Sequence, residues 1–453
     1  MKRVWGLALM VPALAVGLLS AGVSPAVSVT PTAVRTAAAP VPVRGTLFGM
    51  HPVDGTVTAP AGSWRLWDSG VSWPALNPAP GTYNWAPLKA MVDAGHLRGV
   101  NDFVMVLGIT PSWATTNTSH VLPWDHASTS SPPDNLNSYY TFVKALAEYN
   151  RDSLGGAITG FQVWNEMNLS TFWTGTPAQM ATMTGRVDTI IKSVDATYPS
   201  RHVSRTVAPS VTLRRGMLPT TSTACAKVSQ RDACFFGRYL SALASVKGYG
   251  SRSWPIDVFT MHTYPYRDQG PAERAALITS MRARLTERRA PARELWDTEV
   301  NYGLRGVNVA ACGSATPCVR HIDGNTAAQY VARTYLDSVR LGVSRVYWYA
   351  WVGASDVLGI TMQTGSSSAT GYAAVRSWIS GASFTGCTTV SGVYNCGFTK
   401  SGKAFRVLWA NVGTHTVSVK PSSKLCALGK VCTLSSPAAT ATVRVGQTPI
   451  RVG

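Results

Sequence analysis

Short apolar runs alternate with longer amphipathic segments from Gly45 to about Ser380. The apolar runs are continuous, which is typical of strands that are buried on both faces. Strands that alternate with helices predict βαβ units and a parallel sheet. The predicted strands are Thr46–Met50, Trp64–Trp67, Phe103–Ile109, Ile158–Trp164, His202–Val207, Ile256–His262, Glu294–Thr298 and Val343–Trp351.

Eight such strands with interleaved helices favour a (β/α)8 barrel. An open, doubly wound sheet would need a Gly-rich phosphate-binding turn after an early strand, and the sequence has neither G-x-G-x-x-G nor G-x-x-x-x-G-K. We therefore predict an α/β fold with a (β/α)8 TIM barrel over residues 45–380. Its helices are expected to include Leu136–Asn150, Ala178–Thr197, Phe235–Val246, Pro271–Arg288, Thr326–Leu341 and Tyr372–Ile379.

The composition changes after about Ser380. Residues 384–453 are rich in Thr, Val, Ser and Gly and have no helical periodicity. Short strands are predicted over Gly392–Gly397, Ala404–Asn411 and Thr414–Val419. This region is expected to form a small, β-sandwich-like all-β domain.

The N-terminus has the pattern of a targeting segment. Basic residues are followed by an apolar run from Val4 to about Leu19, and then by small residues that permit cleavage after Ala26 or Ala39. This is the order of regions in a secretory signal peptide, and the run is short for a membrane span. We predict a signal peptide and linker over residues 1–39, a secreted protein, and no stable membrane insertion once the leader is removed. An uncleaved anchor is the alternative.

The chain is strongly basic, with 41 Lys and Arg against 22 Asp and Glu and a formal net charge of +19. Such a surplus can indicate nucleic-acid binding. The basic residues are scattered, however, and no nucleic-acid-binding module accompanies them. We expect a secreted monomer with a basic surface and no nucleic-acid partner.

The eight cysteines fall into four close pairs. An even count behind a signal peptide predicts disulfides in an oxidising compartment. Spacing alone does not determine connectivity, and local pairing is the expectation. No Cys or His cluster has zinc-ligand spacing, so no metal and no cofactor is predicted. The pairs are Cys225/Cys234, Cys312/Cys318, Cys387/Cys396 and Cys426/Cys432.

The strongest local signal is the segment Gly160–Asn168, where an apolar strand ends in Trp164-Asn165-Glu166. Polar residues at the C-terminal end of a barrel strand lie at the catalytic face. Desolvation can raise the pKa of a carboxyl beside an indole, so that it holds a proton near neutral pH and acts as a general acid. Glu166 is the candidate for this role, although a lone strand-end Glu in a surface ion pair is the commoner case.

A second strand, within Glu294–Tyr302, also delivers carboxylates to its end. Asp297 and Glu299 are two residues apart, so a regular strand would direct both side chains to one face. Glu299 is closer to the mouth and is the preferred candidate. Asp297 is expected to be its buried partner.

Two strand-end carboxylates suit glycoside hydrolysis, in which one protonates the leaving oxygen and the other attacks the anomeric carbon or activates water. Glu166 ends the fourth predicted strand and Glu299 the seventh. This pairing, with Asn165 before the first Glu, resembles the clan A glycoside hydrolases. The resemblance implies that Glu166 is the acid/base and Glu299 the nucleophile of a retaining enzyme.

Other motifs extend the resemblance across the barrel. Arg65 in Ser-Trp-Arg-Leu-Trp-Asp matches the early-strand Arg that supports the nucleophile, and Gly81-Thr-Tyr-Asn-Trp85 resembles a segment common in these barrels. His262 and Tyr264, in Phe-Thr-Met-His-Thr-Tyr-Pro, match residues that flank the nucleophile. Among families, the chain is most similar in appearance to family 39, the β-xylosidase and iduronidase group.

Aromatic residues at the predicted strand ends suit sugar stacking. The resemblance implies that Trp348 or Trp351, in Val-Tyr-Trp-Tyr-Ala-Trp, forms the floor of the sugar site. Trp113 is a further candidate for stacking, and His51 for hydrogen bonding to the sugar. Core packing is the alternative for the tryptophans.

Two other functional classes compete with a glycoside hydrolase. A non-catalytic carbohydrate- or cell-wall-binding barrel would explain the aromatic residues and the basic surface, but it would not need both carboxylates. A secreted Ser hydrolase would need a G-x-S-x-G elbow, which the sequence lacks. The predicted substrate is a glycan, and the sequence does not define its identity or linkage.

Overall fold

A computed structural model describes residues 39–453 apart from 54, 118, 123–124, 201, 215–230, 305–318, 354 and 356. The predicted signal peptide and linker, apart from residue 39, therefore lie outside the described residues. Among the described helices, none is long and apolar enough to cross a membrane.

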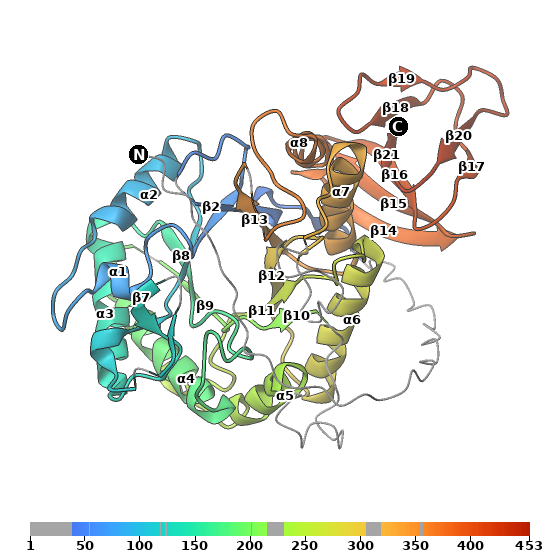
Figure 1. The fold of residues 1–453 in the computed structure, drawn as a ribbon. Coiled ribbons are helices and arrows are strands. Elements are labelled where there is room, and N and C mark those ends of the chain that lie inside the picture. The colour runs from blue at the N-terminus through green and yellow to red at the C-terminus, as the bar shows by residue number, and fades with distance from the viewer. Residues whose placement is uncertain are drawn as a thin grey trace.

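The centre of the molecule is a closed barrel of parallel strands (Figure 1). Its fifth position consists of two short segments, β9 and β10, which both pair with β11. This arrangement confirms the predicted (β/α)8 barrel. In order around the barrel, the strands are β2 (Phe48–Pro52), β3 (Ser63–Leu66), β4 (Phe103–Val106), β8 (Ile158–Gln162), β9 (Arg205–Val207) with β10 (Thr212–Leu213), β11 (Val258–Thr263), β12 (Glu294–Val300) and β13 (Arg345–Trp351).

Helices form the outer ring around the strands (Figure 1). A small sheet of β5 (Thr110–Pro111), β6 (Val121–Leu122) and β7 (Asp125–Thr129) lies in the connection between β4 and α3. The helices are α1 (Trp73–Leu76), α2 (Ala86–His96), α3 (Leu136–Ser153), α4 (Pro177–Asp195), α5 (Arg231–Leu243), α6 (Pro271–Glu287), α7 (Gly324–Arg340) and α8 (Ser367–Ile379). Short 3-10 turns cover Gly45–Leu47, Ser112–Ala114 and Tyr249–Ser251.

Local sequence explains where several of these helices begin. At the start of α4, Thr176 Oγ1 accepts from the Gln179 backbone N–H at 3.1 Å, and Gln179 Oε1 accepts from the Thr176 N–H at 2.8 Å. Pro177 occupies the first helical position, where a missing N–H has no cost. Helices α3 and α8 begin after Asn135 and Ser366, whose side chains accept from backbone N–H groups.

The lower barrel interior is filled by large side chains. Trp296 and Tyr347 pack with Val104, Val207 and Val258 in one buried cluster. Small residues make room for them: a Cβ on Gly49 would lie 2.5 Å from the Tyr347 ring. The barrel is therefore a packed core, and only its mouth is available for a site.

The C-terminal region is all β, as predicted. A seven-stranded antiparallel sheet contains most of its strands, and β17 pairs with β20 in a separate ribbon. One strand comes from the other end of the chain: β1 (Val41–Pro42), just after the predicted linker, pairs with β14. The remaining strands are β14 (Ser383–Val390), β15 (Val393–Lys400), β16 (Lys403–Ala410), β17 (His415–Ser418), β18 (Lys424–Ala427), β19 (Thr433–Leu434), β20 (Thr442–Val445) and β21 (Ile450–Val452).

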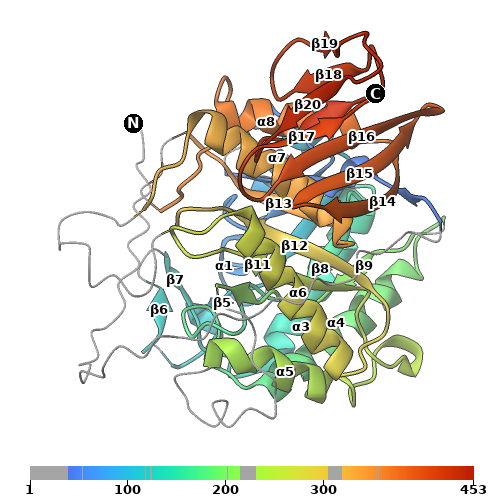
Figure 2. The ribbon, with the colours of Figure 1, turned by 90° about the vertical axis from the view of Figure 1, so that its right-hand side faces the viewer.

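This β region packs on the barrel beside α7 and α8 (Figure 2). The apolar core is continuous across the boundary, because Phe384 and Trp409 belong to the same buried cluster as the barrel residues. Polar contacts add to it: the Arg340 guanidinium of α7 lies 4.7 Å from the centre of the Tyr394 ring.

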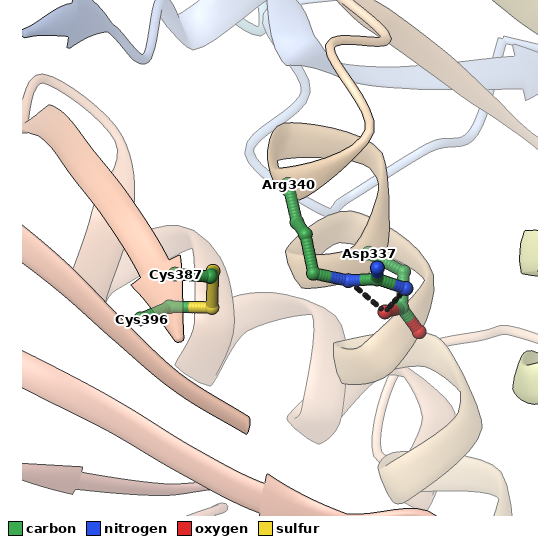
Figure 3. The surroundings of a disulfide bond; sticks show 4 residues. All are labelled: Asp337, Arg340, Cys387 and Cys396. Carbon is green, nitrogen blue, oxygen red and sulfur yellow. Dashed lines mark hydrogen bonds and ion pairs between the residues drawn. A yellow bond between two sulfur atoms is a disulfide. The ribbon is translucent and has the colours of Figure 1, made fainter. Parts of the chain in front are cut away.

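Two of the predicted disulfides are present in the β region. Cys387 and Cys396 face each other across β14 and β15 and are bonded, close to the Asp337–Arg340 pair of α7 (Figure 3). Cys426 and Cys432 form the second bond. Both pairings confirm the expected local connectivity. Three of the other four cysteines, Cys225, Cys312 and Cys318, lie outside the described residues.

Candidate active site

Glu166 lies at the mouth of the barrel, four residues after the end of β8. Its backbone has φ 39°, in the left-handed region that is uncommon for a residue with a side chain. The next barrel position holds this conformation: the Glu166 N–H donates to Ser210 Oγ at 2.9 Å, and the Met167 N–H donates to the Ser210 carbonyl at 3.0 Å. Local strain of this kind concentrates at functional sites, where neighbours determine the backbone.

Glu299 reaches the mouth because β12 contains a bulge. The strand partners shift from Met261 opposite Asp297 to His262 opposite Glu299, which leaves Thr298 as the extra residue. The expectation that Asp297 and Glu299 share one face is therefore wrong. Asp297 points toward the helices, where Arg274 Nη2 donates to Asp297 Oδ2 at 2.6 Å, while Glu299 points into the barrel mouth.

His262, on β11, joins the two glutamates. Its Nδ1 lies 2.9 Å from Glu166 Oε1 and 3.3 Å from Glu299 Oε2. One carboxylate oxygen from each glutamate and one ring nitrogen of His262 all lie within 4.8 Å of one another. Glu166, His262 and Glu299, which are far apart in the sequence, thus converge at the barrel mouth.

Arg65, on β3, connects the two strand ends from below. Its Nη1 donates to Glu299 Oε1 at 2.7 Å and its Nη2 to Asn165 Oδ1 at 2.8 Å. Its Nε donates to Gln162 Oε1 at 2.7 Å. The fully buried guanidinium uses its fork of donors to hold the nucleophile candidate and the residue before the acid candidate in one geometry.

Tyr264 and His51 complete the support of Glu299. The Tyr264 hydroxyl donates to Glu299 Oε2 at 2.6 Å. His51 Nε2 lies 2.9 Å from the carbonyl oxygen of Thr298, the bulge residue, and the ring is 1% exposed. This contact steadies the bulge, and hydrogen bonding of His51 to a sugar stays a prediction.

Burial shifts the pKa values of Glu166, Glu299 and His262. Desolvation raises the pKa of Glu166 to about 7, although the charge of Arg214 opposes the shift. Desolvation also raises the pKa of Glu299 above its ordinary value, and Arg65 is among the groups that oppose this shift. Burial lowers the pKa of His262 to about 3, so the imidazole is neutral and can donate only from one nitrogen.

The predicted tryptophan floor is only partly compatible with the structure. Trp348 is completely buried and tilts against Tyr302 with ring centres 6.3 Å apart, so it presents no face to a sugar. Trp351 is 7% exposed and belongs to the core cluster. Trp113 is partly exposed, but its Nε1 donates to the Asn77 carbonyl at 2.8 Å. Side chains alternate along a strand, and Tyr347, next to Trp348, packs in the barrel interior, so the burial of Trp348 favours core packing; a role of either tryptophan in sugar stacking stays a prediction.

Four residues at the mouth were not singled out from sequence. Tyr349 follows Tyr347 on the inward face of β13, and its hydroxyl donates to Asp68 Oδ2. Trp67 and Phe172 lie edge to face with centres 6.0 Å apart, and both are partly exposed. Two sequence signals could have identified some of them. Tyr349 is two residues after Tyr347 on β13, and Trp67 and Asp68 directly follow β3, the strand that carries Arg65.

Glu166, His262 and Glu299 are also the group of described residues whose donor atoms could surround a metal ion. Their oxygen and nitrogen atoms are already engaged with one another and with Arg65 and Tyr264. A cationic guanidinium at 2.7 Å from Glu299 disfavours a second cation there. The arrangement suits proton transfer and nucleophilic attack by carboxylates.

Comparisons of the sequence with protein-family models and with curated proteins give no match. Solved structures do match. A family 39 glycoside hydrolase from Bacteroides cellulosilyticus WH2 aligns with a TM-score of 0.60 at 16% identity, over 90% of this chain and 81% of that one.

Two further structures give the same picture. A family 30 endoxylanase from Clostridium papyrosolvens C71 has a TM-score of 0.56 at 14% identity, over 91% of this chain and 97% of that one. A family 39 enzyme from Xanthomonas axonopodis pv. citri has a TM-score of 0.55 at 14% identity, over 92% and 95%. This chain therefore shares the fold of barrel glycoside hydrolases over nearly its whole length, including the β region.

Proposed function

We propose that this protein is a secreted, retaining glycoside hydrolase of the clan A type. The observation that carries the proposal is the pair of buried glutamates at the ends of β8 and β12, with carboxylate oxygens within 4.8 Å of each other. Retaining enzymes have carboxyl groups roughly 5–5.5 Å apart, whereas inverting enzymes leave about 6.5–9.5 Å for a water. The separation favours direct attack by one carboxylate.

Glu166 would act first as the general acid. A pKa of about 7 keeps much of this carboxyl protonated near neutral pH, so it can give a proton to the departing glycosidic oxygen. Glu299 would attack the anomeric carbon and form a glycosyl-enzyme ester. Glu166, now ionised, would then take a proton from the water that breaks this ester, which regenerates both side chains and keeps the anomeric configuration.

The neighbours of Glu299 support the nucleophile role. Arg65 binds Oε1 and Tyr264 binds Oε2, so both oxygens are oriented and negative charge on them is stabilised. Neutral His262 can donate its Nδ1–H toward either glutamate, which allows the hydrogen bond to follow the charge from Glu299 to Glu166 during the cycle.

The proposed substrate is a polysaccharide or oligosaccharide with an O-glycosidic bond. The similar structures are described as family 39 and family 30 enzymes, one of them an endoxylanase. Trp67, which directly follows β3, and Phe172, in the segment that follows Glu166, are partly exposed and offer apolar surface for a sugar ring. The disulfides of the β region fit export to an oxidising compartment.

Proton NMR of the first-formed product tests the mechanism, with a glycan found by screening culture-derived protein against a panel of polysaccharides and aryl glycosides. Retention of configuration is expected. Glu299→Ala should lose activity, and azide should restore turnover with the inverted glycosyl azide as product. Glu166→Gln should lose activity on poor leaving groups but form the intermediate from activated aryl glycosides.

An inverted wild-type product would overturn the role of Glu299. Failure of the wild type to cleave any member of the panel, combined with measurable glycan binding, would instead support the non-catalytic carbohydrate-binding alternative.

A further inference from the structure

Asp68 is a third carboxylate at the mouth of the barrel. It follows β3 by two residues, and Arg65 of the same strand binds Glu299. Unlike the two glutamates, Asp68 is exposed to solvent. Its charge nevertheless interacts with those of Glu166 and Glu299, so it lies within the electrostatic reach of both.

Tyr349 fixes the orientation of this carboxylate. The Tyr349 hydroxyl donates to Asp68 Oδ2, and its ring lies edge to face on His51 with centres 5.0 Å apart. Since His51 binds the carbonyl of the bulge residue Thr298, the contacts run without a break from Asp68 to the backbone beside Glu299. A carboxylate held in this way is preorganised, and preorganisation reduces the entropy lost when a ligand binds.

Asp68 also lies next to an aromatic surface. Trp67, its neighbour in sequence, packs edge to face on Phe172 from the loop that follows Glu166. Going round the mouth from Glu299 to Glu166, the exposed or partly exposed described side chains include Tyr349, Asp68, Trp67 and Phe172. A carboxylate beside aromatic rings matches a sugar, which has apolar C–H faces and hydroxyl edges.

The donors and acceptors at this position favour a neutral sugar. A carboxylate offers about four acceptor positions, and Tyr349 occupies one on Asp68. Sugar hydroxyls can donate to the others, whereas a sugar carboxylate would bring a like charge toward Asp68. Arg65 is committed to Glu299, Asn165 and Gln162. Among the described residues, Arg214 is a further cation whose charge acts on Glu166, and its guanidinium lies 6.0 Å from the Tyr264 ring centre.

We propose that Asp68 binds the sugar held at Glu299 by accepting hydrogen bonds from its hydroxyl groups, and that it selects neutral sugars over uronic acids. This inference rests on the proposed glycoside hydrolase function and deepens it by naming the substrate class. The proposed sugar contact is acidic, in contrast to the chain as a whole, which carries a formal charge of +19.

Matched 4-nitrophenyl glycosides test the selection. Pairs such as glucoside and glucuronide, or galactoside and galacturonide, differ only in a hydroxymethyl or a carboxylate group and are assayed in both anomers. Wild type should cleave the neutral member at least about 100-fold better than the uronide. Asp68→Asn should lower kcat/KM on the neutral member by about 10- to 100-fold, mainly through KM, because a charge-assisted hydrogen bond is weakened. The preference over the uronide should shrink by tenfold or more.

Monodeoxy glycosides give a readout that a merely structural role would not move. When the substrate lacks the contacted hydroxyl, kcat/KM of the wild type should fall by about the same factor as the Asp68→Asn substitution causes on the full sugar. On that deoxy substrate, the Asp68→Asn substitution should lower kcat/KM little further. Tyr349→Phe should have a smaller effect of the same kind. Asp93→Asn, on α2 and paired with Lys89, is the matched control and should match wild type on every substrate.

Wild-type kinetics in Asp68→Asn with a normal melting temperature would overturn the proposal, as would a wild-type preference for uronides, which would assign recognition to Arg214 instead. The proposal would also be overturned if the effect of Asp68→Asn and the effect of removing a hydroxyl were additive for every deoxy substrate, because Asp68 would then contact none of the hydroxyls. Absence of hydrolysis by wild type on all glycosides and polysaccharides would overturn the proposed function itself, and the two failures are therefore distinguishable.

Discussion

Asp297 and Glu299 are two residues apart on β12, and each is paired with a buried arginine. Arg274 meets Asp297 on the side of the strand that faces α6 and α7, and both side chains are 0% exposed. Arg65 meets Glu299 inside the barrel mouth, where the Glu299 side chain is 7% exposed. The distances are nearly equal, 2.6 and 2.7 Å.

The difference lies in what surrounds each pair. Thr263 donates to Asp297 from its backbone and side chain, and Arg274 also donates to Ser338 of α7 at 2.9 Å, so the outer pair connects strands to helices. Glu299 instead lies close to a second carboxylate, Glu166, and keeps access to the mouth. A buried ion pair is thus structural or reactive according to the face of the strand it occupies.

The largest expected effect is on activity at the inner pair. Glu299→Gln should reduce kcat/KM by ~10⁴-fold or more, because the amide cannot form the covalent intermediate. Asp297→Asn, its matched control on the other face, should leave kcat/KM of the folded enzyme within about tenfold. Steady-state kinetics on an aryl glycoside measures both. Equal losses would show that the outer pair also serves the reaction.

For stability the order is reversed, and the outer pair, Asp297 with Arg274, is expected to matter more than the inner pair. Asp297→Ala leaves the Arg274 charge buried without its partner and should lower the free energy of unfolding by about 3–5 kcal/mol. Glu299→Gln should cost less, because Arg65 retains Asn165 and Gln162 as acceptors. Urea denaturation followed by tryptophan fluorescence measures the difference. A larger cost for Glu299→Gln would contradict the structural assignment of the outer pair.

The alternation of faces is repeated on β13, where Trp348 points outward and Tyr349 inward. Trp348→Ala should cost about 3 kcal/mol of stability through the cavity it leaves, and KM should stay within about twofold of wild type. Thermal unfolding and kinetics at 20 °C below the variant's melting temperature separate the two effects. A tenfold rise in KM would restore Trp348 as part of the sugar site.

The last prediction concerns the alkaline limb of the pH profile, which we assign to Glu166. The active form has Glu166 protonated and Glu299 ionised, so kcat/KM should fall in acid as Glu299 is protonated, and by about tenfold per pH unit above about 7 as Glu166 loses its proton. Glu166→Gln should remove this alkaline limb on activated aryl glycosides, since the amide does not titrate. A limb that persists in the variant would assign it to a group other than Glu166.

Much of the site was predictable because the barrel itself was. Once eight strands are assigned, the residues at their C-terminal ends must converge, and Glu166, Glu299, Arg65, His262 and Tyr264 do so. Trp348 and His51, by contrast, were chosen by residue type, and the structure buries both side chains. Their burial depends on which way a strand faces and on how deeply a side chain is covered.

The sequence by itself determined the order of strands and helices, the all-β end and which strand ends carry carboxylates, and it favoured the local disulfides at Cys387 and Cys426. These features follow from hydrophobic periodicity and close spacing, which are local properties of the chain. Tertiary structure alone decided that a bulge at Thr298 turns Glu299 inward and Asp297 outward, and that Asp68 meets Tyr349 across 281 residues. A bulge and a contact between distant strands depend on neighbours that no local pattern contains, and for that reason the fold was predictable while the direction of its decisive side chains was not.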